Sequence, residues 1–247
     1  MKMTVIFPVF NEMKSPFFKN TLLIYDQWGL FDNQGLEFIF VDGASQDDTT
    51  SLIKAYSSNI ISLPNSNRAQ RIIKGVSSAS APIILLHHPR SVLEKGSIQK
   101  VLNTLYPVKD KFAWGGFTHK FDNQGLVYKF TSWYSNKIRA RIKEIIYLDH
   151  CIFFTKNFVE NKLIDLPSAP IFEDTIISQE LRTHGPPILI NKSSITSSIR
   201  FKKNGFFFQS LLNQIMKLMF SFGFNFEQMD KIYEKSLNLN SGKKSND

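Results

Sequence analysis

The sequence predicts an α/β protein with a mostly parallel central sheet and helices on both faces. Over residues 1–120, short β-branched or aromatic runs alternate with helical stretches. Strand, helix and strand in this order are typical of a parallel sheet that is covered on both sides. Hydrophobic residues make up 43% of the 247 residues, and 23 are Phe. The chain therefore has enough apolar material for a core, which excludes global disorder.

Four strands are expected in the first half, because four runs are short, apolar and bounded by turn residues. They cover residues 4–7, 37–41, 60–63 and 83–86. Ser15 followed by Pro16 predicts a helix that runs to about residue 28. A second helix is expected to begin at residues 47–50, and a third to cover 68–79.

The second half is less regular. Strands are expected at residues 112–121 and 152–154, and helices at 126–141, 173–184 and 206–222. Gly223 can end the last of these helices, and Asn225 with Gln228 has the spacing of a capping box for one more. No interior linker or repeat interrupts the chain. We expect one domain over residues 1–237, with a nucleotide-binding half to about 120 and an acceptor half beyond it, then a disordered tail over 238–247.

The helix at 206–222 is amphipathic. Gln209, Asn213, Lys217 and Ser221 form a polar stripe at a spacing of four. The wide apolar face consists of Phe208, Leu211, Leu212, Ile215, Leu218, Met219 and Phe222. Such faces usually pack against the domain, so we expect this one to point inward. Docking on anionic lipid, as a peripheral membrane contact, and dimerisation are the alternatives.

The charge and cysteine content limit the classes of partner. The single cysteine, Cys151, excludes an intramolecular disulfide framework and a Cys-rich zinc module. No apolar run reaches the ~20 residues of a membrane-spanning helix, so a cytoplasmic protein is expected, with the inner face of the membrane as the alternative. The net charge of +9 lies mostly beyond residue 128, while residues 163–180 hold four acidic and no basic side chains. This distribution favours a phosphorylated or lipid-linked partner over nucleic acid.

The strand ends carry acidic residues rather than a phosphate-binding motif. The sequence contains no GxGxxG, GxxxxGK[ST], HExxH or CxxC pattern. Instead Glu12 follows the first predicted strand and Asp42 the second. In parallel sheets ligands bind at the carboxyl ends of strands, where a carboxylate can accept hydrogen bonds from a base or a ribose. We interpret Asp42 as such a ligand residue and Asp47 as a helix N-cap.

Two segments together resemble the opening of a family 2 glycosyltransferase of the GT-A fold. They are Ile-Phe-Pro-Val-Phe-Asn-Glu at 6–12 and Phe-Val-Asp-Gly-Ala-Ser-Gln-Asp-Asp-Thr at 40–49. Segments 68–70, 85–87, 147–150, 172–174 and 200–205 follow in the order typical of a bacterial subfamily labelled arsenosugar-biosynthesis glycosyltransferases. The resemblance extends to about residue 233.

The resemblance implies inverting transfer of a sugar from a nucleotide diphosphate sugar, usually a UDP-sugar, to an acceptor hydroxyl. It places Pro8, Asn11, Glu12 and Asp42 around the nucleoside, and Arg68 near the donor diphosphate. Asp149 and Arg200 would lie on the acceptor side.

It also matches Glu173 and Asp174 to an acidic catalytic pair, with Asp174 as the general base. Single displacement needs one carboxylate to accept the proton of the attacking hydroxyl. The alternative is that acidic residues simply favour the first turn of a helix.

One position departs from the family pattern. The family places a metal-binding Asp after the fourth strand, where this chain has Pro89, and proline cannot bind Mn²⁺ or Mg²⁺. We favour Arg90, with Arg68 or Arg71, as the source of positive charge at the diphosphate. The alternatives are a metal bound by His87 or His88, or a non-catalytic relative that binds a nucleotide sugar or a glycan without turnover.

Overall fold

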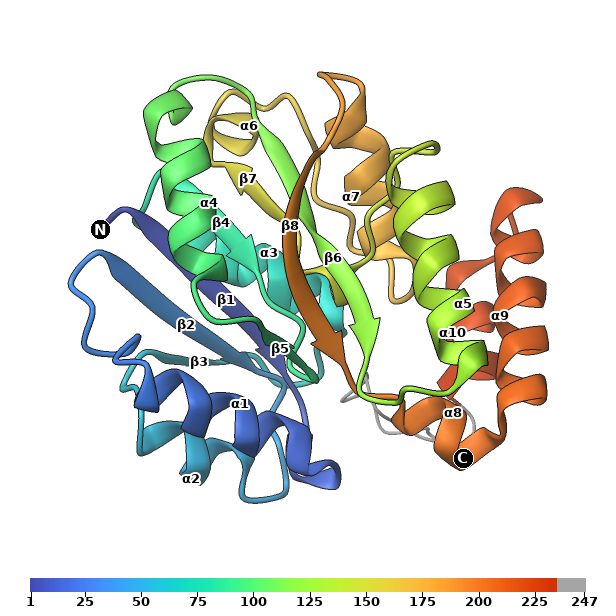
Figure 1. Cartoon of the computed structure of the whole chain (residues 1–247). Coiled ribbons are helices and arrows are strands. Elements are labelled where there is room, and N and C mark those ends of the chain that lie inside the picture. Colours follow the sequence, from blue (N-terminus) through green and yellow to red (C-terminus); the bar gives the residue numbers. More distant parts are fainter. Residues whose placement is uncertain (235–247) are drawn as a thin grey trace.

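The computed structural model describes residues 1–234, and an eight-stranded sheet forms its centre (Figure 1). The expected tail at 238–247 lies outside the described residues. The strand order is β3-β2-β1-β4-β7-β6-β8-β5. The strands are β1 (Met3–Val9), β2 (Leu36–Asp42), β3 (Ile60–Ser62), β4 (Ile83–Leu86), β5 (Ser91–Leu93), β6 (Trp114–Phe121), β7 (Phe153–Thr155) and β8 (Ile188–Thr196).

The sheet is mostly parallel, as the sequence predicts. Strands β1 to β4 pair in parallel with one another, and so do β6 and β8. Strand β7 is antiparallel to both β4 and β6, and β5 is antiparallel to β8. Six strands therefore run in one direction and two in the other.

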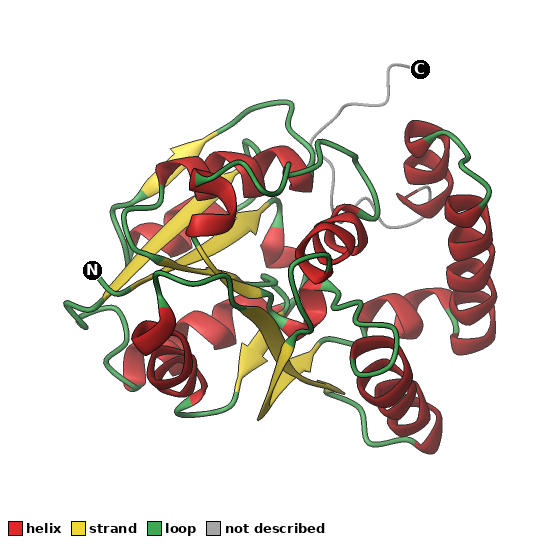
Figure 2. Cartoon of the chain, turned by 90° about the horizontal axis from the view of Figure 1, so that it is seen from above, coloured by secondary structure: helices red, strands yellow, loops and turns green. Residues whose placement is uncertain are grey.

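Helices cover both faces of the sheet, as the view from above in Figure 2 shows. The helices are α1 (Pro16–Gln27), α2 (Thr49–Lys54), α3 (Arg68–Ser78), α4 (Ser97–Leu105), α5 (Leu126–Tyr134), α6 (Asn157–Glu160), α7 (Glu173–Arg182), α8 (Ile199–Asn204), α9 (Phe206–Ser221) and α10 (Phe226–Glu234). Ser15 caps α1, accepting a hydrogen bond from the N–H of Phe17. The helix predicted at 126–141 is α5 followed by a π-helical segment, Ser135–Ala140.

The core consists of two apolar layers, one on each side of the sheet. Alternate residues of β1 supply both layers, because neighbouring side chains of a strand point to opposite faces. Val5 and Phe7 join the layer that holds α1 and α4, whereas Ile6 joins the layer that holds α3 and α7. Gly75 lets α3 lie close to β1: a Cβ at this position would stand 2.4 Å from Cγ2 of Ile6.

The C-terminal helices α8, α9 and α10 lie to one side of the sheet (Figure 1). The apolar face of α9 is exposed, which is the opposite of the orientation predicted from the sequence. Its apolar face was expected to point inward, but Leu211 and Leu218 are 61% and 59% exposed. Gln209 from the polar stripe is fully buried. The expectation was wrong because the inner side of α9 lines a cavity, to which it contributes Ser210, Asn213 and Lys217, and does not pack on an apolar layer of the sheet.

Candidate active site

Two loops at the carboxyl ends of β1 and β2 bind each other through the predicted nucleoside residues. Asn11 has a left-handed backbone (φ 49°), and its N–H donates to Oγ of Ser45 at 2.9 Å. Oδ1 of Asn11 accepts a hydrogen bond from the N–H of Gln46 at 2.8 Å. Asp42 accepts from both the N–H (3.0 Å) and the hydroxyl (2.5 Å) of Ser45. Pro8 is buried within β1. These contacts hold the two loops together.

Asp47 also links these loops, at the start of α2. Its Oδ1 accepts from the N–H of Thr49 at 3.1 Å, and its Oδ2 accepts from the N–H of Met13 at 3.1 Å. The N-cap of α2 is the next residue, Asp48, whose side chain makes no capping hydrogen bond. Asp47 therefore makes a capping hydrogen bond, as predicted, but it precedes the N-cap residue by one position.

Glu12 and Arg90 form a buried ion pair next to these loops. Oε2 of Glu12 lies 3.3 Å from Nη1 of Arg90, and both side chains are at most 7% exposed. Burial raises the pKa of Glu12, and the positive charge of Arg90 opposes that rise. The pair places the guanidinium of Arg90 at the wall of a cavity.

Arg71 lies beside the loops that follow β1 and β2 and does not line the cavity. A Cβ on Gly43 would stand 2.2 Å from its Nη1, so the glycine makes room for this side chain. The guanidinium also lies 5.7 Å from the ring centre of Phe10, and Nη1 donates to the carbonyl of Ser66 at 3.2 Å. Burial lowers the pKa of Arg71 to about 10, although Glu12 opposes the shift.

The two acidic residues at the start of α7 lie in different surroundings. Glu173 is fully buried, binds Nε of Arg68 and lies beneath the cavity. Asp174 lines the cavity, where its Oδ2 accepts from the N–H of Leu148 at 2.9 Å. Burial, reinforced by the charge of Glu173, raises the pKa of Asp174 to about 6.

Backbone strain marks the same helix start. Phe172 precedes the acidic pair in a left-handed conformation, φ 63°, which is costly for a large side chain. Its ring packs against Phe220 of α9, with ring centres 4.7 Å apart. The contact joins α9 to the residue that orients the acidic pair.

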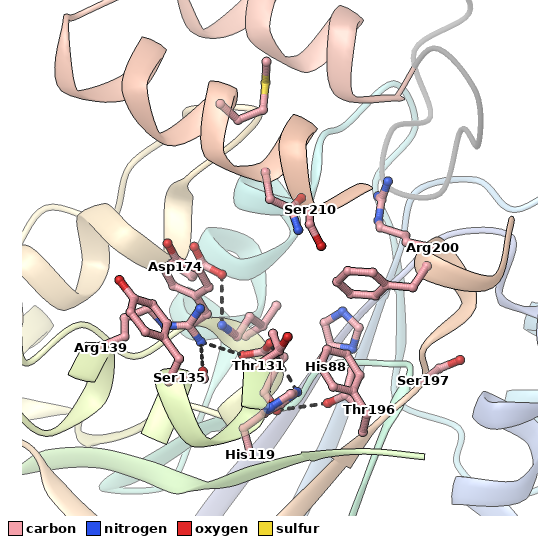
Figure 3. Close-up of a pocket in the computed structure, with 18 of the residues that line it drawn as sticks. His88, His119, Thr131, Ser135, Arg139, Asp174, Thr196, Ser197, Arg200 and Ser210 are labelled. Atoms are coloured by element: carbon pink, nitrogen blue, oxygen red, sulfur yellow. Dashed lines mark hydrogen bonds and ion pairs between the residues drawn. The ribbon is translucent and has the colours of Figure 1, made fainter. Parts of the chain in front are cut away.

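The cavity has a volume of about 630 Å³ and lies between the sheet end and the helices α5, α8 and α9 (Figure 3). Strand ends and the loops next to them supply His88, Arg90, His119 and Thr196. Helix α9 supplies Ser210 together with Asn213 and Lys217, two members of the predicted polar stripe. Arg200 of α8 also lines the cavity. Its Nη2 lies 2.5 Å from Oε1 of Glu234, and its Cζ lies 4.5 Å from the ring centre of Tyr233.

Asp149 is surrounded by positive or protonatable groups. Its carboxylate oxygens lie 3.5 Å from Nε2 of His119, 3.8 Å from Nε2 of His150 and 3.6 Å from Nη2 of Arg139. Burial raises the pKa of Asp149, but His119, His150 and Arg139 outweigh this effect and hold it well below its usual value. The side chain is therefore an anion at the cavity floor.

Burial disfavours the charged form of both histidines in this cluster. It lowers the pKa of His150 to about 3, and it lowers the pKa of His119 as well. His150 donates from Nδ1 to the carbonyl of Phe117 at 2.8 Å, which leaves Nε2 as the acceptor for Ser135 at 2.8 Å. His119 and Arg139 were not predicted as site residues; the available signal for His119 was its position inside the strand predicted at 112–121.

The residues after β4 do not fit the expected Mn²⁺ or Mg²⁺ site. His87 uses both ring nitrogens in the core: Nδ1 donates to the carbonyl of His88 at 2.9 Å and Nε2 accepts from Tyr25 at 2.6 Å. His88 faces the cavity, and its Nδ1 accepts from the N–H of Arg90 at 3.1 Å. Pro89 contributes no ligand atom from its side chain. Within residues 1–234, no group of three or more His, Cys, Asp or Glu is arranged to hold a metal ion.

Comparisons with known proteins agree with this architecture. The sequence model described as Glycosyl transferase family 2 matches residues 4–164. No curated protein matches the chain. No helix among the described residues is long and apolar enough to cross a membrane.

Crystal structures of S. aureus TarS are similar in fold. The structure of TarS 1–349 with UDP-GlcNAc has a TM-score of 0.60 and 13% identity over 96% of this chain and 72% of that one. For the complex with UDP, the TM-score is 0.61 and the identity 14%, over 96% of this chain and 71% of that one. The longer TarS structure aligns with a TM-score of 0.59 and 14% identity, over 96% of this chain and 43% of the TarS chain.

Proposed function

The chain belongs to glycosyl transferase family 2. We propose that it transfers a sugar from a nucleotide diphosphate sugar to an acceptor hydroxyl, with inversion of the anomeric configuration. Asp174 carries the proposal, because its carboxylate lines the cavity and has a pKa raised to about 6. A base with a pKa just below neutral is ionised in the cell and still takes up a proton readily.

The proposed reaction is a single displacement. Asp174 accepts the proton of the acceptor hydroxyl while the hydroxyl oxygen bonds to the anomeric carbon. The bond from that carbon to the diphosphate oxygen breaks, and its electron pair leaves with the nucleoside diphosphate. One step with attack opposite the leaving group inverts the anomeric configuration.

Arginine side chains are the proposed partners of the donor diphosphate. Glu173 contacts Nε of Arg68, so among the described residues the two terminal nitrogens of this guanidinium remain for phosphate oxygens. Arg90 lines the same cavity, and a planar guanidinium can bind phosphate through two parallel hydrogen bonds. We place the nucleoside against the loops of Asn11, Glu12 and Asp42, next to Pro8. The TarS complexes with UDP and UDP-GlcNAc support a UDP-sugar as donor.

Asp149 and Arg200 are the proposed acceptor residues. Both line the cavity, with Asp149 at its floor and Arg200 on α8 near α10. An anionic Asp149 can accept hydrogen bonds from acceptor hydroxyls, whereas Arg200 suits a phosphate of a phosphorylated or lipid-linked acceptor. The finer resemblance to the arsenosugar-biosynthesis subfamily remains part of this proposal.

The decisive experiment separates donor binding from transfer. Titration calorimetry with UDP-sugars and GDP-sugars measures donor affinity, and a screen of acceptors measures transfer. Asp174→Asn is expected to lower kcat by about 10²–10⁴-fold while donor affinity stays within a few fold, because only the base is removed. Glu180→Gln on the same helix is the matched control and should leave both unchanged. Loss of donor binding in Asp174→Asn would contradict the general-base role.

A non-catalytic relative that binds a nucleotide sugar or glycan is the second candidate. Pro89 favours it, because the family's metal-binding Asp is missing. This candidate predicts donor binding without transfer or donor hydrolysis in any acceptor screen. Detectable turnover that disappears in Asp174→Asn would eliminate it, and absence of any donor binding would count against both candidates.

A further inference from the structure

The apolar side of helix α9 is exposed, whereas the apolar side of a helix usually packs against the core. Its apolar residues at Phe207, Leu211, Leu218 and Phe222 are 88%, 61%, 59% and 78% exposed. Their spacing places them along one side of the 16-residue helix. Helix α5 does the same, with Leu126, Phe130 and Trp133 at least half exposed. We call the exposed apolar residues of these two helices the apolar surface; they are Leu126, Val127, Phe130, Trp133, Phe207, Phe208, Leu211, Ile215, Leu218 and Phe222.

The orientation of α9 is held by hydrogen bonds on its other side. Gln209 accepts from Nδ2 of Asn204 at 2.7 Å and donates to Oδ1 of Asn213 at 2.8 Å. Tyr233 of α10 donates to the same Oδ1 at 3.3 Å. Rotating the helix to hide its apolar side would break this buried polar network, which is costly. The apolar surface therefore faces outward in the folded chain, where soluble monomers rarely expose an extended apolar strip.

The two segments that carry the apolar surface hold basic but no acidic side chains. Residues 126–143 hold five basic and no acidic side chains, and residues 199–224 hold four basic and none acidic. Lys129, Lys137 and Lys203 are exposed and form no ion pair within the described part of the chain. Exposed lysines beside an apolar helix face complement negatively charged lipid headgroups.

We propose that the apolar surface docks on an anionic lipid bilayer, with α5 and α9 lying in the interface. A second copy of the chain is a poorer occupant, because a symmetric contact would bring the same basic side chains together. The chain's own remaining residues are also unsuited, since the stretch 235–247 has only two leucines as apolar side chains.

Docking would bring the cavity to the bilayer. Val127 and Phe130 belong both to the cavity lining and to the apolar surface, so the cavity opens beside that surface. An acceptor carried on a lipid would enter directly from the membrane. This consequence for the acceptor rests on the proposed function, whereas docking itself does not.

Vesicle sedimentation tests the docking without any sugar donor. The full chain is mixed with vesicles of phosphatidylcholine alone or of equal parts phosphatidylcholine and phosphatidylglycerol. Sedimentation with the anionic vesicles only, weakened by salt, is expected. Trp133 is half exposed, so its fluorescence should shift to the blue on binding, and Trp133→Phe should remove most of that shift. Absence of sedimentation with anionic vesicles would overturn the proposal, as would a salt-sensitive dimer that hides Trp133 without lipid.

Two sets of variants locate the contact. The first set is the triple variant Lys129→Gln/Lys137→Gln/Lys203→Gln. It is expected to weaken vesicle binding by about 100-fold, because each lysine near an anionic surface strengthens binding by roughly tenfold or less. Leu211→Glu/Leu218→Glu should abolish it. The matched controls, Lys54→Gln/Lys95→Gln/Lys100→Gln and Leu23→Glu, change exposed residues on other elements and should bind as the unmodified chain does. Circular dichroism melts verify that every variant is folded, and equal loss in the control sets would refute a specific face. Calorimetric donor binding is measured separately, so failure of docking leaves the proposed function intact.

Discussion

The surroundings of Asp174 act on the pKa of its carboxyl in opposite directions. Burial and the neighbouring Glu173 raise its pKa, while Arg68 and the N–H of Leu148 lower it. The resulting value of about 6 lies above the usual range for Asp. Asp149, in the same cavity, has its pKa held low by His119, His150 and Arg139. Two carboxylates with separated pKa values in one cavity suit one proton-accepting role and one permanently anionic role.

The rate of transfer should therefore depend on pH through Asp174. The base works only when ionised, so kcat is expected to rise tenfold per pH unit below about 6 and to level off above it. The measurement is kcat at saturating donor and acceptor between about pH 5 and 8. Asp149 is already ionised throughout this range, and its charge is the smallest of the effects on the pKa of Asp174, so Asp149→Asn should lower activity and move the midpoint only slightly, to lower pH. A flat profile would contradict the assignment of Asp174.

At the level of elements, α3 and β1 pack without room for a methyl group at Gly75. The Cβ added by Gly75→Ala would lie 2.4 Å from Cγ2 of Ile6, inside the layer beneath α3. Overpacking of this kind costs about 1–3 kcal/mol, which outweighs the gain of up to ~1 kcal/mol in helix propensity. Chemical denaturation should show a lower free energy of unfolding. Lys74→Ala, exposed on the same helix, should change it little, and an equal or higher stability for Gly75→Ala would disprove the tight contact.

The elements that were predictable are those whose local pattern matches their environment. Strand β4 begins and ends where the apolar run 83–86 predicts. Strand β8 was missed because its second half is polar, with Ser193 and Ser194 buried by pairing with neighbours distant in sequence. The amphipathic pattern of α9 predicts a helix correctly, but it does not show that a cavity lies on the inner side of the helix and takes up polar side chains there. Likewise, adjacent acidic residues at 173 and 174 cannot reveal that only one of them reaches the cavity.

At the scale of the whole molecule, three buried glutamates bring three arginines to one cavity. Glu12 binds Arg90 between two strand-end loops, Glu173 binds Arg68 between α7 and α3, and the third pair, Arg200 with Glu234, joins α8 to α10. Arg90 directly follows Pro89, which stands where the family pattern has its metal-binding Asp. A sheet end, an inner helix and the C-terminal helices thus contribute positive groups that no single stretch of sequence displays together.

Transfer is accordingly expected to be independent of added metal. Treatment with EDTA should leave kcat/KM within about twofold, because we propose that Arg68 and Arg90 supply the positive charge at the diphosphate. Arg68→Gln should lower kcat/KM by about 10²–10³-fold, the usual loss when one preorganised donor to a developing negative charge is removed. Because this variant leaves Glu173 buried without its partner, Arg68→Lys is measured beside it, and partial recovery is expected since lysine keeps the charge but loses the fork. Arg182→Gln, exposed at the end of α7, is the control. Full loss of activity in EDTA, restored by Mn²⁺, would show that a cation and not the arginine pairs supplies the charge.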